Sequence, residues 1–181
     1  MPPRKTQQIA VFSVLVAVCL ATQILPRPLG LEFTSFLTFS TGIIFGSFLG
    51  ASFGVTVMII NGFLSPWGLA GINLPFQMLG MGIIGAAGGL YKMTNGSNVR
   101  FFGETAVMGA FLTLIYYIIT NMGFAINLML FTQFSPLDAI IISQISGAFV
   151  TLMYIISNTI LFGFGVVPLV SAIRKLYGGE K

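Results

Sequence analysis

The groups best placed to do chemistry in this 181-residue chain are uncharged amide and aromatic side chains. The stretch NGFLSPWGLAGINLPFQ, residues 61–77, holds two Asn, one Gln and the only Trp, with no charged residue. Buried amides in lipid are costly unless they pair with each other or with a ligand. Two interpretations stay open: contacts between helices with ordinary loop solvation, or a pocket for a polar, mostly uncharged small molecule.

Groups that would support catalysis are scarce. The chain has no histidine, the commonest general base and metal ligand. The carboxylates do not pair at a spacing suited to acid–base work; they are Glu32, Glu104, Asp138 and Glu180. No G-x-x-x-x-G-K-[ST] segment is present to bind a nucleotide in a P-loop. We therefore expect no enzyme, no cofactor and no metal site.

The composition predicts an integral membrane protein with one domain over residues 1–181. Hydrophobic residues make up 56% and charged residues 7% of the chain, against about 25% charged in a soluble domain. A membrane-spanning helix needs about 20 mostly apolar residues. We expect an all-α membrane protein, a compact bundle of six transmembrane helices at about residues 8–25, 33–46, 47–62, 73–92, 104–126 and 138–173.

The basic residues decide between six helices and five. The uncharged stretch 33–60 reads either as one long tilted helix or as two helices that meet near residues 46–51. If residues 33–60 form two helices, the chain has six in total, and both termini lie in the cytoplasm with only Arg27 among the basic residues outside. The positive-inside rule prefers this arrangement. The basic residues then inside are Arg4, Lys5, Lys92, Arg100, Arg174, Lys175 and Lys181. They stand at segment ends rather than on one face, which argues against a nucleic-acid partner.

This topology gathers polar side chains in the outer half of the bundle, where several aromatic residues also fall. These polar and charged residues, with Trp67, are Gln23, Arg27, Glu32, Thr34, Asn61, Trp67, Asn73, Gln77, Asn121, Asn127, Gln133, Asp138 and Gln144. No ionisable residue is expected in mid-membrane, which makes an ordinary ion-coupled carrier less favoured.

Small residues recur at helical spacing in three places. Gly42, Gly46, Gly50 and Gly54 are four apart, which would align them on one helix face, and 80–89 is similarly rich in Gly and Ala. Small side chains let helix backbones approach closely in membranes, so we expect these clusters to pack inside the bundle. Ser13, Ala17 and Ala21, also four apart, form a stripe on the first helix that suits docking of another helix, internal or from a partner.

These features together resemble the substrate-binding S components of energy-coupling factor (ECF) vitamin transporters, over nearly the whole chain. The matching stretches are SVLVAVCLA, GIIFGSFLGASFG and LSPWGLAGINLPFQMLGMGIIGAAGG. The resemblance implies a prokaryotic, multi-pass protein of the plasma membrane that captures a vitamin or related micronutrient on the outside. It further implies docking on a transmembrane coupling subunit that works with two ATPase subunits. The implied substrates are of the cobalamin-like, riboflavin or thiamine class, and the segment PFQMLGMG looks most like S components associated with cobalamin or related ring-containing vitamins.

The resemblance also implies roles for particular residues. Ser13, Ala17 and Ala21 would face the coupling subunit, although the family stripe is often Ala-x-x-x-Ala and a serine stands first here. The loop from Arg27 to Glu32 would gate the site. The implied substrate-binding residues are Arg27, Glu32, Trp67, Asn73, Gln77, Tyr117, Asn121 and Gln144. Two alternatives remain: a stand-alone carrier or channel that does not use ATP, and a membrane scaffold subunit without transport activity.

Overall fold

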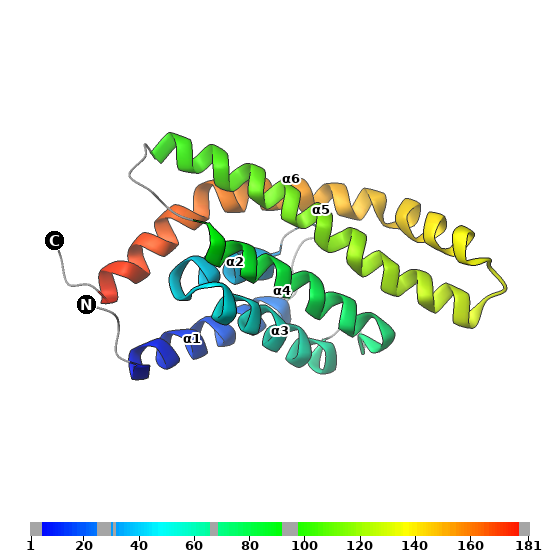
Figure 1. Cartoon of the computed structure of the whole chain (residues 1–181), viewed down its shortest axis with the longest axis horizontal. Coiled ribbons are helices and arrows are strands. Elements are labelled where there is room, and N and C mark those ends of the chain that lie inside the picture. Colours follow the sequence, from blue (N-terminus) through cyan, green and yellow to red (C-terminus); the bar gives the residue numbers. More distant parts are fainter. Residues whose placement is uncertain (1–4, 25–29, 31, 66–68, 92–97, 178–181) are drawn as a thin grey trace.

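The computed structural model describes residues 5–24, 30, 32–65, 69–91 and 98–177, and every regular element in these ranges is a helix (Figure 1). The helices are α1 (Lys5–Ile24), α2 (Thr34–Phe45), α3 (Ser47–Leu64), the short 3-10 helix η1 (Gly71–Asn73), α4 (Leu74–Leu90), α5 (Asn98–Phe131) and α6 (Pro136–Tyr177). Over these described ranges, the all-helical class and the expected six α-helices are thereby confirmed.

Four of these helices, α1, α3, α5 and α6, are long and apolar enough to cross a membrane. The 12-residue α2 rises only about 18 Å, less than the roughly 30 Å thickness of a bilayer core. Six complete spans and cytoplasmic termini therefore stay predictions.

Successive helices alternate in direction, so α1 begins and α6 ends at the same end of the molecule (Figure 1). Lys5, Arg100, Arg174 and Lys175 lie on the helix turns at that end, which we call the basic end. The hairpin of α5 and α6 extends beyond the other helices at the opposite end (Figure 1). It is longer than predicted, because α5 begins six residues before residue 104 and ends five residues after 126.

The break in the uncharged stretch falls at Gly46. This residue has φ 94° and ψ 169°, a region that glycine adopts far more readily than other residues. One long helix over 33–60 is therefore excluded. The break also corrects the expected glycine stripe, because Gly42 lies on α2 whereas Gly50 and Gly54 lie on α3.

These glycines nevertheless pack against one partner, α4. A Cβ placed on Gly42 would collide with the carbonyl oxygen of Gly85, and one on Gly54 would lie 2.6 Å from that of Met81. On the α4 side, a Cβ on Gly85 would collide with the backbone of Gly50. Missing side chains thus bring α2, α3 and α4 into backbone contact, and the predicted packing role is confirmed for Gly42, Gly50, Gly54 and Gly85, whereas a Cβ on Gly46 would meet no atom within 4 Å.

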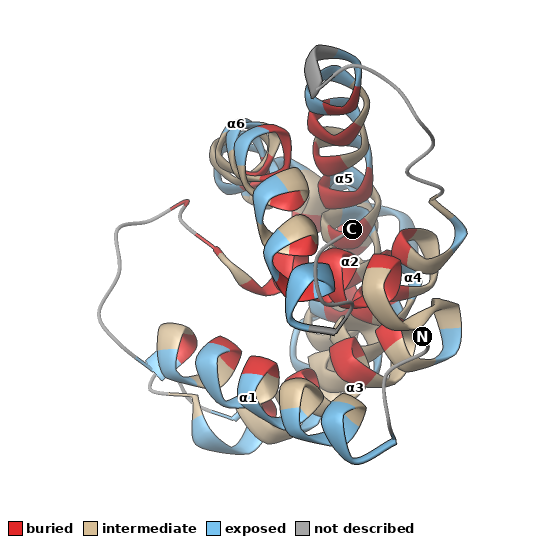
Figure 2. Cartoon of the chain, turned by 90° about the vertical axis from the view of Figure 1, so that its left-hand side faces the viewer, coloured by how far each residue is buried: buried red, intermediate tan, exposed pale blue. Residues whose placement is uncertain are grey.

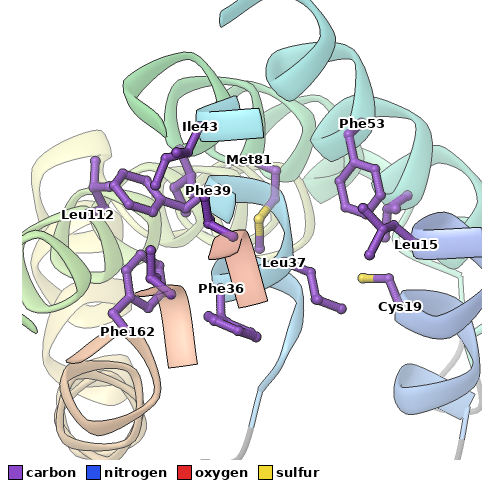
Figure 3. Packing of buried hydrophobic residues seen from close by; sticks show 14 of the residues in the cluster. Leu15, Cys19, Phe36, Leu37, Phe39, Ile43, Phe53, Met81, Leu112 and Phe162 are labelled. Atoms are coloured by element: carbon purple, nitrogen blue, oxygen red, sulfur yellow. The ribbon is translucent and has the colours of Figure 1, made fainter. Parts of the chain in front are cut away.

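Helix α2 lies between the other helices and is buried along most of its length (Figure 2). Phe39 of α2 is fully buried, and the centroid of its ring lies 5.2 Å from that of the Phe162 ring on α6. On the other side of the core, Leu15 and Cys19 of α1 face Phe53 of α3 (Figure 3). Helix α1 presents its remaining faces outward, since it packs chiefly on α3 and α2.

Candidate functional site

A polar cavity of about 320 Å³ lies where α1 and α3 end and α2 and α4 begin, away from the basic end. This volume lies near the lower limit of small-molecule pockets, about 300–1,000 Å³. Side chains from all six α-helices or their flanking residues reach it. They are Gln23, Glu32, Met58, Asn61, Ser65, Asn73, Gln77, Tyr116, Tyr117, Thr120, Asn121 and Tyr154.

The structure brings five of the predicted binding residues together in this cavity: Glu32, Asn73, Gln77, Tyr117 and Asn121. Gln144 is not among the lining residues. Its Oε1 instead accepts a hydrogen bond of 3.2 Å from Asn121 Nδ2, and its Nε2 donates to the carbonyl oxygen of Ile118 at 3.2 Å. Through these two hydrogen bonds, Gln144 of α6 fixes the orientation of the Asn121 side chain on α5. Arg27 and Trp67 lie outside the described residues.

Three cavity-lining amides have a buried oxygen without a hydrogen-bond partner: Gln23 Oε1, Asn73 Oδ1 and Gln77 Oε1. Gln23 is 4% exposed, and its Nε2 donates to Thr34 Oγ1 at 2.6 Å. A buried polar atom without a partner costs free energy. These oxygens are therefore free to accept hydrogen bonds from a molecule that enters the cavity.

Tyrosine rings form one wall of the cavity. Tyr117 on α5 stacks with Tyr154 on α6, with centroids 5.1 Å apart and planes at 25°. Tyr116 meets Tyr117 edge-on at 5.3 Å and donates from its hydroxyl to Met58 Sδ at 3.9 Å. A ring face next to fixed polar groups is typical of small-molecule sites.

Sequence reasoning did not select several lining residues for the site. Gln23, Asn61 and the aromatic residue Tyr116 were predicted to lie in the outer half of the bundle without a binding role, and Ser65 lies in the stretch 61–77 without having been singled out. Met58, Thr120 and Tyr154 were not predicted at all. Thr120 had a usable signal, since it directly precedes Asn121 and follows Tyr117 by three residues. Tyr154 had none, because its position depends on how α6 pairs with α5.

Glycines make room for two of the amides. A Cβ on Gly123 of α5 would collide with Asn73 Oδ1 and lie 2.8 Å from the Phe76 ring. A Cβ on Gly147 of α6 would lie 2.7 Å from Asn121 Nδ2. The positions of Asn73 and Asn121 thus depend on missing side chains in the neighbouring helices.

The predicted docking residues Ser13, Ala17 and Ala21 are exposed on α1. They lie on the face opposite the buried residues Leu15, Cys19 and Gln23, which are also spaced by four. The stripe is therefore not used for packing within the described part of the chain, and the internal-partner interpretation is wrong there.

A second hollow, of about 330 Å³, lies at the basic end between α1 and the α2–α3 junction. Apolar side chains such as Phe12, Phe45 and Leu49 dominate its lining, so it lacks the converging polar groups that orient a small molecule. Across the described residues, no three His, Cys, Asp or Glu side chains gather into a metal site.

Arg100 and Tyr91 hold Glu104 at the basic end. Arg100 Nε lies 2.6 Å from Glu104 Oε1, and the Tyr91 hydroxyl donates to Glu104 Oε2 at 2.8 Å. This cluster joins the end of α4 to the start of α5 and is remote from the cavity.

Comparison of the chain with protein-family models, with curated proteins and with solved structures gives no significant match.

Proposed function

We propose that this chain is the substrate-capture subunit, or S component, of an ECF-type importer and that the polar cavity holds its vitamin-type substrate. The observation that carries the proposal is the set of three buried amide oxygens without partners in one cavity. A purely structural amide would be expected to find a partner within the protein.

The cavity volume supports the smaller of the implied substrate classes. A corrinoid such as cobalamin is much larger than riboflavin or thiamine, and about 320 Å³ is near the lower limit for ligand pockets. We therefore favour a substrate of the riboflavin or thiamine class over a cobalamin-like one.

The exposure of Ser13, Ala17 and Ala21 supports docking on a coupling subunit. Small residues on an exposed helix face let a second helix approach its backbone closely. Two ATPase subunits would supply the energy, since this chain has no P-loop. In the proposed topology, a prokaryotic plasma membrane surrounds six spans, the basic end faces the cytoplasm and the cavity faces outward.

The first test is native mass spectrometry of the detergent-purified chain, together with identification of the proteins that copurify. We expect a bound vitamin of the riboflavin or thiamine class, a coupling subunit and two ATPase subunits. Recovery of the chain with neither small molecule nor ATPases, from cells that express all of them, would contradict the proposal.

Ala17→Trp tests the docking role. We expect this variant to abolish uptake of the vitamin identified by mass spectrometry, because the indole fills the stripe, while binding to the purified chain is unchanged. Val107→Trp is the matched control, since Val107 is 68% exposed on α5, away from the stripe; it should transport normally. Normal uptake by Ala17→Trp would show that α1 is not the docking helix.

One observation favours a second candidate, a stand-alone carrier. The buried helix α2 carries five hydroxyl side chains, Thr34, Ser35, Thr38, Ser40 and Thr41, and leads from the cavity toward the basic end. Thr38 Oγ1 and Ser40 Oγ have no hydrogen-bond partner. Uptake into proteoliposomes that contain only this chain would support this candidate and refute the ATP-driven one.

A further inference from the structure

The cavity offers more hydrogen-bond acceptors than the protein itself uses. Gln23 Oε1, Asn73 Oδ1 and Gln77 Oε1 are contributed by α1, by η1 at the start of α4 and by α4. The terminal torsions of amide side chains have broad energy minima, so small rotations can turn these oxygens onto a bound molecule. A ligand that donates hydrogen bonds would satisfy them, whereas a ligand that only accepts would leave them unpaired.

The charges of the side chains that line the cavity also restrict the kind of ligand that fits. Glu32, 7% exposed, is the one charged side chain among the described residues that line the cavity, and no Lys or Arg is among them. Among the described lining residues, an anionic ligand would therefore meet a carboxyl group and no basic side chain. Such an arrangement disfavours negative charge on the ligand.

The tyrosines indicate the shape of the ligand. Tyr117 and Tyr154 stack on each other, Tyr116 lies edge-on to Tyr117, and all three residues line the cavity. Aromatic rings prefer offset-stacked or edge-to-face partners, and ring faces also attract cations.

We infer that the cavity binds a small planar heteroaromatic molecule that presents exocyclic amino or carboxamide N–H donors and carries no negative charge. This inference rests on the proposed function for the location of the site and narrows the substrate class. Gln23, Asn73 and Gln77 are its specificity-determining acceptors.

Matched probe pairs test the inference by calorimetric titration of the full-length purified chain in detergent. Thiamine and oxythiamine differ by an amino donor replaced with an oxo acceptor, and nicotinamide and nicotinate differ by a carboxamide replaced with a carboxylate. We expect thiamine and nicotinamide, which carry the exocyclic N–H donors, to bind about tenfold or more tightly than oxythiamine and nicotinate, respectively. Equal or tighter binding of oxythiamine or nicotinate, or no binding of any of the four, would overturn the inference.

Variants of Gln77 then test whether its oxygen is responsible. Gln77→Leu removes the acceptor and should shrink the preference for the donor-bearing probe severalfold, whereas Gln77→Glu retains an acceptor and should keep it. Gln133→Leu is the matched control, since Gln133 is exposed on the connection between α5 and α6. An unchanged preference in Gln77→Leu would contradict the role assigned to the Gln77 oxygen. If Gln77→Leu does not fold, loss of the preference in Gln77→Glu would contradict that role equally.

These titrations contain no coupling subunit or ATPase. Reversed probe preferences with intact copurification of those subunits would therefore refute the ligand class and leave the proposed function standing. If the probes bind with the expected preferences but no ATPase copurifies with the chain, the ligand class is supported and the proposed function is refuted.

Discussion

At the level of single residues, the geometry of the cavity depends on two glycines that do not themselves line it. Gly123 and Gly147 allow the amides of Asn73 and Asn121 to approach α5 and α6 more closely than any larger side chain would permit. These positions therefore influence binding although they offer no hydrogen-bonding side chain.

Gly123→Ala tests this dependence. The new methyl group would collide with Asn73 Oδ1, so Asn73 must move and ligand affinity should fall about tenfold, while overpacking lowers stability by about 1–3 kcal/mol. Gly103→Ala is the control on the same helix, because no atom lies within 4 Å of its Cβ position. Titration and thermal denaturation of both variants check the expectation; equal affinity in the two would refute the role of Gly123.

At the level of elements, the contact of α4 with α2 and α3 is the tightest part of the bundle. Gly85→Ala would place a methyl group into the backbone of Gly50, where no side chain can rotate away. We expect a loss of about 3 kcal/mol or more, measured as earlier thermal unfolding in detergent.

Gly82→Ala is the matched control one turn away on α4. Its Cβ would lie 3.6 Å from Val55 Cγ2, an ordinary contact, and alanine is the better helix former by about 1 kcal/mol. Stability should therefore be unchanged or slightly higher. Similar unfolding temperatures for the Gly82 and Gly85 variants would show that the backbone contact does not limit stability.

The sequence was sufficient to predict the six helices, because apolar runs and turn residues alternate along the chain. It did not reveal how far α5 and α6 extend. The fifth helix was predicted to begin at about residue 104, but Arg100 and Glu104 pair four residues apart and the helix already begins at Asn98. At the start of α6, Ser135 and Asp138 form a cap with Pro136 at the first position, so the helix begins before residue 138.

At the level of the whole molecule, the orientation in the membrane is testable with a single-cysteine approach. The one native cysteine, Cys19, is fully buried and should react poorly with a water-soluble maleimide. Gln133→Cys should be labelled from outside intact cells, whereas Lys175→Cys should be labelled only after permeabilisation. The reverse pattern would invert the proposed topology.

The candidate site was partly predictable because depth along each helix follows from the sequence. Counting residues from the helix ends places Asn73, Gln77 and Asn121 in the half of the bundle away from the basic end. The rotation of each helix about its axis does not follow in the same way. That rotation turns Gln144 toward Asn121 and brings Tyr154 against Tyr117, and it results from packing between α5 and α6.

The unequal lengths of the helices have a consequence for the surrounding lipid. Helix α1 has 20 residues and rises about 30 Å, whereas α5 and α6 have 34 and 42 residues and rise about 51 and 63 Å. A bilayer core of about 30 Å matches the first but mismatches the other two, which must tilt or project. Gln23 on one side of the cavity belongs to a helix that matches this thickness, whereas Tyr154 on the other side belongs to one that exceeds it, so the proposed topology predicts that the acyl-chain length of the lipid influences ligand affinity.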